Sequence, residues 1–195
     1  MKRTSTETGY PTSGQLEKEL DRIKLRRDTR KAVVGAIGTL LVFAAAAVLI
    51  STLLLPVAQV RKGSMNPTLY DGEILIFETV GNINKGDIIA FRYDNQILIK
   101  RVIATAGDRI DIGGDGAVIL NGDLLDEPYV VQPDAGVCTI ELPLNVPREQ
   151  YFVMGDHRAT SIDSRSADIG LISREQIVGK LLLRIWPLEK FGIPR

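Results

Sequence analysis

The sequence contains very little cysteine, histidine or tryptophan, with one residue of each among 195. Cys138 therefore has no partner for an intramolecular disulfide and no second thiol for a metal site. The single histidine, His157, would have to carry any Ser-His-Asp triad, and it disfavours a metal site built from histidines. We therefore expect neither a metal nor another cofactor, and a serine hydrolase with this sequence could work without a catalytic histidine if another residue served as its base.

Net charge is also absent, because 24 Lys and Arg residues balance 24 Asp and Glu residues. The balance hides an asymmetry, since residues 1–31 hold nine basic and five acidic side chains and the rest of the chain is correspondingly acidic. Taken alone, such a basic arm would indicate only a solvated tail. The segment that follows the arm gives it a more specific meaning.

A run of 24 residues without a charge, residues 32–55, follows the arm. As a helix rising about 1.5 Å per residue it would reach ~36 Å, enough to cross a hydrocarbon core of about 30 Å. A cleaved signal peptide is the main alternative, but its apolar region spans roughly 7–15 residues and its basic lead is shorter. We therefore favour a retained transmembrane anchor, which Pro56 ends.

The basic arm predicts the orientation of this anchor. Because Lys and Arg crowd its N-terminal flank, the positive-inside rule places residues 1–31 in the cytoplasm and residues 56–195 outside, after a single pass through the cell membrane. Membrane lipid is then an expected partner. Residues 181–187 are apolar too, but this segment is too short and too charged for a second span.

Short β-rich runs dominate residues 56–195, and helical periodicity is scarce. A stretch with scattered prolines and polar residues, about 123–147, predicts an insertion between core strands. The predicted fold class is mainly β, an antiparallel β barrel or sandwich preceded by one N-terminal transmembrane helix. The expected strands are 73–77, 87–93, 96–103, 109–112, 117–120, 151–154 and 177–186, with a hairpin joining 109–112 to 117–120.

Ser64 is the first candidate for chemistry. Gly63 before it and Asn66-Pro67 after it favour a turn, which would leave its hydroxyl free of helix or sheet packing. A serine before Asn-Pro often does no more than start a turn, so Ser64 alone is ambiguous. The S-x-x-K spacing of penicillin-recognising enzymes is missing, because the third residue after Ser64 is Pro67.

Lys100 is the candidate base for Ser64. It lies in the predicted strand 96–103, where both faces are largely apolar, and we expect it to be buried. Burial disfavours the ammonium form and can lower a lysine pKa of about 10.4 by several units. A neutral Lys100 could remove the Ser64 hydroxyl proton and later return it to a leaving amine. A snorkelling or ion-paired lysine is the commoner case, and this strand alone leaves both interpretations open.

Four motifs in order along the chain resemble the successive signatures of type I signal peptidases. With the apolar run that precedes them, the resemblance covers nearly everything from residue 32 to the C-terminus. The motifs are Gly63-Ser64-Met65-x-Pro67-Thr68-Leu69, Gly86-Asp87-Ile88, Lys100-Arg101-Val102-Ile103 with Gly107-Asp108, and Gly155-Asp156-x-Arg158-x-x-Ser161-x-Asp163-Ser164-Arg165.

The resemblance implies signal peptidase I, a serine endopeptidase that removes N-terminal signal peptides from exported preproteins through a Ser-Lys dyad. It gives Ser64 the role of nucleophile and Lys100 that of general base. Ser161 matches the second serine of the family, which helps to orient the lysine. The charged scaffold of the family is matched by Asp156, Asp163, Arg165 and Arg101, for which we expect a supporting role through salt bridges.

The same resemblance implies the substrate. Family members accept small residues one and three positions before the cut, often Ala-x-Ala, so signal peptides of secreted preproteins are the expected partners and translocation machinery is a further candidate. Met65 and Ile99 flank the two catalytic positions and could either line the substrate pocket or simply belong to the core. We expect the substrate to bind extended, against an exposed strand edge.

This sequence departs from the family pattern at three places. Lys62 stands two residues before the nucleophile, where some members have the Ser or Thr that supplies the second oxyanion donor. His157 stands where Asn is common, and we expect a polar loop residue there rather than a catalytic acid. The segment 104–106 is Ala-Thr-Ala, where Gly-Leu-Pro is usual.

Two other protein classes compete with the peptidase. A self-cleaving Ser-Lys repressor-type regulator would need a DNA-binding helix-turn-helix in place of the anchor, and residues 1–31 are too few for one, so no nucleic acid partner is expected. The other alternative is a catalytically inactive member that only binds signal peptides. The presence of both Ser64 and Lys100 argues against it, whereas Lys62 keeps it open.

Overall fold

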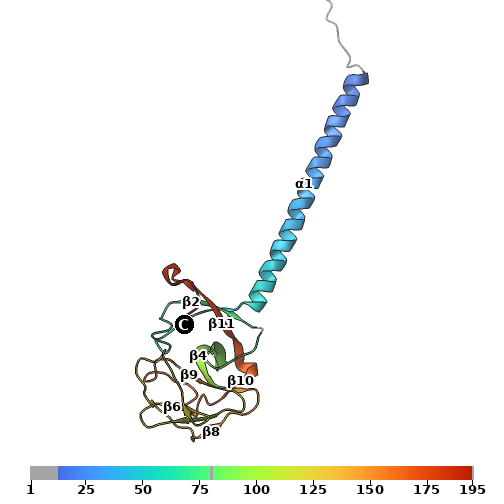
Figure 1. The fold of residues 1–195 in the computed structure, drawn as a ribbon. Helices are drawn as coiled ribbons and strands as arrows, with labels where there is room; N and C mark the ends of the chain where they lie inside the picture. Colours follow the sequence, from blue (N-terminus) through green and yellow to red (C-terminus); the bar gives the residue numbers. More distant parts are fainter. Residues whose placement is uncertain (1–12, 80, 195) are drawn as a thin grey trace, which may run out of the picture. The chain divides into compact units, whose positions relative to one another are not determined.

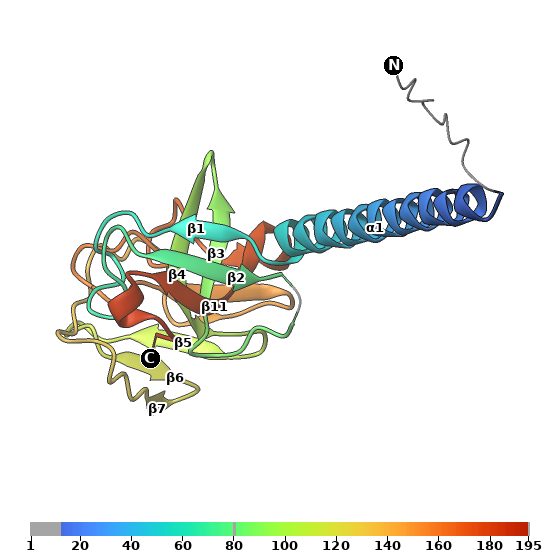
Figure 2. The ribbon, with the colours of Figure 1, turned by 90° about the horizontal axis from the view of Figure 1, so that it is seen from above.

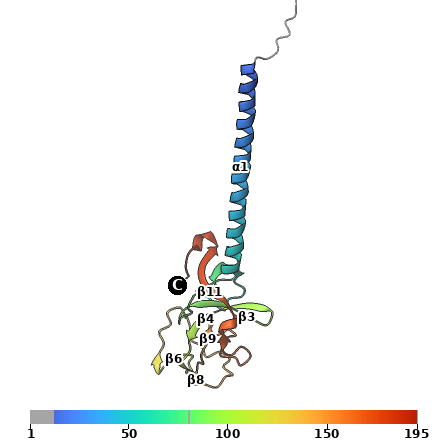
Figure 3. The same cartoon turned by 90° about the vertical axis from the view of Figure 1, so that its right-hand side faces the viewer.

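The computed structural model describes residues 13–79 and 81–194, and the chain divides near residue 50 into two units. The described part of the first unit belongs to one continuous helix, α1 (Ser13–Leu54), which at about 1.5 Å per residue extends for about 63 Å (Figure 3). Among the described residues, α1 is the helix that is long and apolar enough to cross a membrane, and its apolar part is not buried within the protein. This helix provides the predicted N-terminal apolar span.

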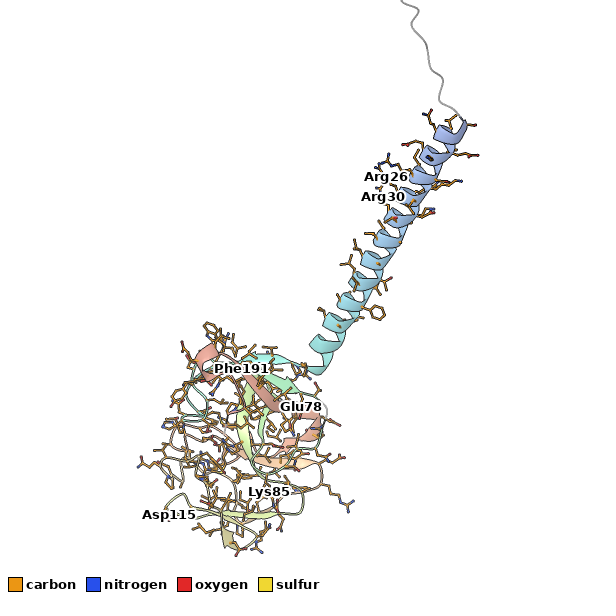
Figure 4. The ribbon with its side chains drawn as sticks, turned by 45° about the horizontal axis from the view of Figure 1, so that its top comes forward. Arg26, Arg30, Glu78, Lys85, Asp115 and Phe191 are labelled. Carbon is orange, nitrogen blue, oxygen red and sulfur yellow. The ribbon has the colours of Figure 1, made fainter. Side chains whose placement is uncertain are left out.

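The start of α1 differs from the prediction, whereas its end agrees with it. The helix begins at Ser13, so residues 13–31 of the basic arm are helical, and residues 1–12 lie outside the described residues. Glu, Lys, Leu and Arg dominate this part and are all good helix formers, which explains the extension. Arg26 and Arg30 lie one turn apart and project from the same side of α1 (Figure 4). The helix ends two residues before Pro56, as expected.

The second unit consists of antiparallel strands in two sheets, so the prediction of a mainly β fold is confirmed. The strands β1, β2 and β11 run side by side, and β5 to β7 form a separate layer (Figure 2). The seven-stranded sheet has the order β1 (Val57–Gln59), β2 (Ile74–Glu78), β11 (Ile177–Trp186), β3 (Ile88–Tyr93), β4 (Gln96–Ala104), β9 (Gln150–Met154) and β10 (Ile172–Ser173). The four-stranded sheet has the order β7 (Asp123–Leu124), β6 (Val118–Leu120), β5 (Arg109–Ile112) and β8 (Leu144–Asn145).

Each strand predicted from the sequence is present, with ends that agree to within one residue. The hairpin between β5 and β6 is also present, in the register Ile110 opposite Leu120. The remaining described elements are short: β1, β7, β8, β10 and two 3₁₀ turns, η1 (Arg174–Gln176) and η2 (Leu188–Lys190). These pieces are too short to show a hydrophobic period, which is why the sequence did not indicate them.

Three apolar clusters fill the β unit and together position the central strands. One cluster packs the segment after β1 against β2 and β3, and a second packs β3 against β4 and β9. The third joins the end of β4 to the four-stranded sheet through Ile103, Ile110 and Phe152. Because β4 contributes to more than one cluster, its C-terminal half is buried on both faces, from Lys100 to Ala104. The first half of the strand is not, since Ile97 remains 50% exposed.

The predicted insertion, residues 123–147, starts and returns through strands of the four-stranded sheet. β7 pairs with β6 and β8 pairs with β5, so both ends of the segment are hydrogen-bonded to the sheet, and β6 and β8 lie at the same end of the β unit (Figure 1). The tip of the β5–β6 hairpin packs on the segment at Gly116, which has a φ of 85°. A Cβ at Gly116 would overlap the backbone of Asp134, so the contact requires glycine.

Candidate active site

Ser64 lies on a turn between β1 and β2, as the sequence predicted. The side chains of Met65 and Leu69 are buried in the adjacent apolar cluster, and Leu69 N donates to the Met65 carbonyl at 2.9 Å, which closes the turn. The Ser64 carbonyl accepts a hydrogen bond from His157 N at 3.1 Å. The Ser64 N–H has no acceptor among the described residues, so it is free to donate to another group.

Lys100 lies on β4 with only 3% of its surface exposed. Its partner on β3 is Ile89, and on the other side Arg101 pairs with Met154 of β9. In an antiparallel ladder the residue before Arg101 faces the residue after Met154, so Lys100 lies opposite Gly155. The buried lysine expected from the apolar strand is therefore present.

Gly155 is the point at which the candidate residues converge. A Cβ built on it would overlap both the Ser64 carbonyl oxygen and the Ser161 hydroxyl. Glycine at this position thus lets the Ser64 turn, the Ser161 loop and the Lys100 strand approach one another. The Ser161 hydroxyl is buried and has no hydrogen-bond partner of good geometry within the described residues.

The Lys100 ammonium group also lacks a hydrogen bond or ion pair with any described residue, Ser64 included. The pKa of Lys100 is lowered from 10.5 to about 8, mainly by burial, and the charges of Arg165 and Lys62 act in the same direction. The carboxylates of Asp163 and Asp156 act in the opposite direction without cancelling the effect. A lysine of this kind exchanges its proton near neutral pH, as a general base must.

Arg101, the next residue of β4, points to the opposite face and is fully paired. Its guanidinium donates to both carboxylate oxygens of Asp156, at 2.9 and 2.6 Å, and to the Gly86 carbonyl at 2.9 Å. Thr68 donates to the same carboxylate at 2.5 Å. The pair ties the strand of Lys100 to the Gly155 loop and to the Ser64 turn.

A second buried pair joins Arg165 to Asp163 through hydrogen bonds of 2.8 and 2.9 Å. Burial alone would raise the pKa of Asp163, but the hydrogen bonds and charge of Arg165, with smaller contributions from the Ser161 hydroxyl and the Gly155 N–H, lower it instead. The Gly155 N–H donates to Asp163 at 3.0 Å. The four predicted scaffold residues therefore form two ion pairs that converge on the Gly155 loop.

The structure adds a third buried pair that the sequence did not predict. Arg158 belongs to one of the recognised motifs but had no assigned role, and it donates two hydrogen bonds to Glu127. Tyr129 lies under Arg101, with the guanidinium carbon 4.0 Å from the ring centroid. Glu127 and Tyr129 belong to the insertion, and no periodicity or motif there marks a residue that pairs across 31 positions of sequence.

The remaining predicted residues lie around this centre. Met65 is 1% exposed and belongs to the apolar cluster beneath the turn, whereas Ile99 is half-buried and packs against the same cluster. Lys62 is exposed, and its backbone N–H donates to Asp71 at 2.7 Å. The exposed ring of His157 hydrogen-bonds to Thr160 through Nδ1, as befits a polar loop residue.

No site for a metal stands out in this part of the molecule. Within residues 13–79 and 81–194, no three His, Cys, Asp or Glu side chains are grouped so that they could hold an ion. A cavity of ≈ 310 Å³ opens beside the Ser64 turn, and its lining includes Pro67, Val131 and His157. The groups that gather around Gly155 are a serine turn, a second serine and buried ion pairs, with Lys100 on the facing strand.

Comparison with known proteins gives consistent matches. The sequence model of the family described as signal peptidase, peptidase S26, matches residues 31–186. A signal peptidase IB of Staphylococcus aureus (strain COL) is 35% identical over 152 residues, which cover 68% of this chain and 78% of that protein. A probable signal peptidase I-2 of Synechocystis sp. is 30% identical over 183 residues, or 88% of this chain and 76% of the relative. The solved structure of a signal peptidase I from Enterococcus faecalis is 28% identical, has a TM-score of 0.45, and covers 53% of this chain and 99% of that one.

Proposed function

Because the chain belongs to the signal peptidase family, peptidase S26, we propose that it is a serine endopeptidase that removes signal peptides from exported preproteins. In this proposal Ser64 is the nucleophile and Lys100 is the general base. The observation that carries the proposal is Lys100 itself, a lysine that is 3% exposed, has no carboxylate partner among the described residues, and faces the loop that contacts Ser64. A buried cation without a partner destabilises a fold, so its presence calls for a functional reason.

The proposed reaction begins with proton transfer. Neutral Lys100 takes the proton of Ser64 Oγ as this oxygen attacks the scissile carbonyl carbon, and the free N–H of Ser64 donates to the oxyanion that forms. Lys100, now an ammonium, gives its proton to the leaving amine, which becomes the N-terminus of the mature protein. Lys100 then activates a water molecule that attacks the ester, releasing the signal peptide and restoring Ser64.

The supporting residues have electrostatic and positional roles in this proposal. The Ser161 hydroxyl, which packs on Gly155, orients the Lys100 amine, since Lys100 lies opposite Gly155 in the ladder of β4 and β9. The pairs Arg165–Asp163 and Arg101–Asp156 hold the loop and the strand that carry them. The half-buried Ile99 and the Met65 beneath it are candidates for the wall that accepts small substrate residues.

The proposed placement in the cell follows from α1 and its flanks. Residues 1–31 are cytoplasmic, residues 32–55 form the single transmembrane anchor, and residues 56–195 form the peptidase domain at the outer membrane surface, with 123–147 as an insertion. Signal peptides emerge on that side of the membrane, where signal-peptide-bearing preproteins and lipid are the partners, and translocation machinery is a further candidate. The basic flank of the apolar span and the positive-inside rule support this orientation.

The test is cleavage of a preprotein by the purified full-length protein in detergent or lipid. A preprotein with an Ala-x-Ala site should be cut once, directly after that site, and mass spectrometry of both fragments identifies the bond. Ser64→Ala, which changes one hydroxyl, should remain folded and cut nothing. Cleavage by Ser64→Ala would contradict the proposed nucleophile. Failure of the folded wild-type protein to cut, with retained binding of the signal peptide, would favour the inactive binding protein instead.

A further inference from the structure

The N–H and the carbonyl of Gly155 are each hydrogen-bonded to a buried charged side chain. Its N–H donates to Asp163 at 3.0 Å, and its carbonyl accepts from Arg158 Nε at 3.1 Å. Gly155 packs directly on the Ser64 carbonyl and the Ser161 hydroxyl and lies opposite Lys100. A shift of Gly155 would therefore change the gap between the proposed nucleophile and base.

The hydrogen bond from Arg158 to the Gly155 carbonyl depends on a carboxylate outside the Gly155 loop, that of Glu127. Arg158 has a side-chain exposure of 0%, and its two terminal nitrogens donate to Glu127 at 2.9 and 2.5 Å. This bidentate contact sets the plane of the guanidinium, and so also the direction of the Nε–H that reaches Gly155. The hydroxyl of Tyr129 donates to Glu127 at 2.9 Å and steadies the carboxylate in turn.

No other described carboxylate hydrogen-bonds to Arg158. Asp156 and Asp163 are each engaged by another arginine. Without Glu127 the terminal nitrogens of a fully buried guanidinium would lack acceptors, so the group would turn toward other oxygens or solvent. In either case Nε would no longer point at the Gly155 carbonyl.

We propose that Glu127 is a positioning residue of this active site, acting through Arg158 on the Gly155 carbonyl to maintain the alignment of Ser64, Lys100 and Ser161. Through Glu127 the segment 123–147 then takes part in catalysis. This inference rests on the proposed peptidase function. A positioning role predicts a loss in kcat with little change in KM, because substrate binding is not what Glu127 affects.

The first test is Glu127→Gln in the full-length protein, assayed on the Ala-x-Ala preprotein. The expected result is a fall in kcat of about 10- to 100-fold with KM within about twofold. The matched control is Glu73→Gln. Glu73 is itself buried and also accepts two hydrogen bonds from an arginine, the partly buried Arg184, at 3.1 Å each, and that pair does not contact Gly155. If both variants lose thermal stability equally but only Glu127→Gln loses kcat, the inference is supported, and equal kcat values for the two variants would overturn it.

The decisive variant removes both charges at once, as Glu127→Met with Arg158→Met. Replacing a buried ion pair by apolar side chains often restores stability, but methionine cannot donate to the Gly155 carbonyl. A melting temperature near that of the wild type with kcat still at least about tenfold lower supports positioning. Recovery of both quantities would show a merely structural pair and overturn the inference. Inactivity of the wild type itself would reject the peptidase proposal rather than this one, so the two failures are distinguishable.

Discussion

The two faces of β4 carry neighbouring buried cations with opposite surroundings. Arg101 is 7% exposed and is engaged by a carboxylate, a carbonyl and an aromatic ring. Lys100 is 3% exposed and hydrogen-bonds to no described residue. A cation that is fully paired keeps its proton and joins segments together, whereas one that is desolvated and unpaired can release its proton. The contrast separates the structural face of the strand from the face that we propose to be catalytic.

Lys100→Met should produce the largest loss of activity among these variants, and it should do so while the folded protein becomes more stable. Preprotein cleavage should fall by about 10⁴-fold or more, because no base remains for Ser64. The folded protein should nevertheless become more stable at neutral pH, since a pKa lowered from 10.5 to about 8 corresponds to at most about 3 kcal/mol of destabilisation. Cleavage assays and urea unfolding of the variant provide the two measurements.

The pH dependence of the free energy of unfolding tests whether the buried Lys100 destabilises the fold through its lowered pKa. Between pH 8 and 10.5 the unfolded lysine binds more proton than the folded one, so the wild type gains stability as the pH rises through that window. Its deficit relative to Lys100→Met should therefore shrink toward pH 10.5. A deficit that stays constant across the window would mean that Lys100 keeps its proton in the fold.

Arg101→Met should have the opposite signature on the other face. Removing this guanidinium leaves the carboxylate of Asp156, 2% exposed, without its arginine, which costs about 3–5 kcal/mol of stability. Cleavage at permissive temperature should fall in proportion to the unfolded fraction. Chemical unfolding monitored by circular dichroism measures the loss. An Arg101→Met protein as stable as the wild type would refute the structural assignment of this face.

Ser161→Ala should have a moderate effect confined to the catalytic face. The substitution deletes a hydroxyl that contacts Gly155 and that, in the wild type, helps to lower the pKa of Asp163. We therefore expect kcat to fall about fivefold to tenfold. Stability should hardly change, because this hydroxyl has no well-formed hydrogen bond within the described residues. Steady-state kinetics measures the expected fall in kcat, and a melting curve checks that stability is unchanged. An unchanged kcat would remove Ser161 from the proposed mechanism.

His157→Asn should have the smallest effect. The ring is exposed and bonds to Thr160, and only the backbone N–H of residue 157 reaches the Ser64 carbonyl. Asparagine retains that N–H, so kcat/KM should change by less than about twofold. A larger loss would indicate that the imidazole takes part.

The sequence was informative where burial follows a period or a motif. The longer strands of the seven-stranded sheet, β2, β3, β4, β9 and β11, were evident from apolar runs. Ser64 and Lys100 became candidates through a turn signal and an apolar strand, and their roles came from the resemblance to signal peptidases. The exposure of Ile97 could not be predicted, because the more exposed first half of β4 is as apolar as its buried second half. Glu127 could not be found either, since its partner lies 31 residues away and pairing across loops follows no local pattern.

The most direct test of the central claim is the pH dependence of kcat/KM for preprotein cleavage by the wild-type protein. If Lys100 acts as a neutral base, the rate should rise about tenfold per pH unit below its pKa and level off above pH 8. The Glu73→Gln control should show the same inflection. A profile without an inflection between pH 6 and 10, or one whose inflection lies near the ordinary lysine pKa of 10.5, would contradict a catalytic role for Lys100.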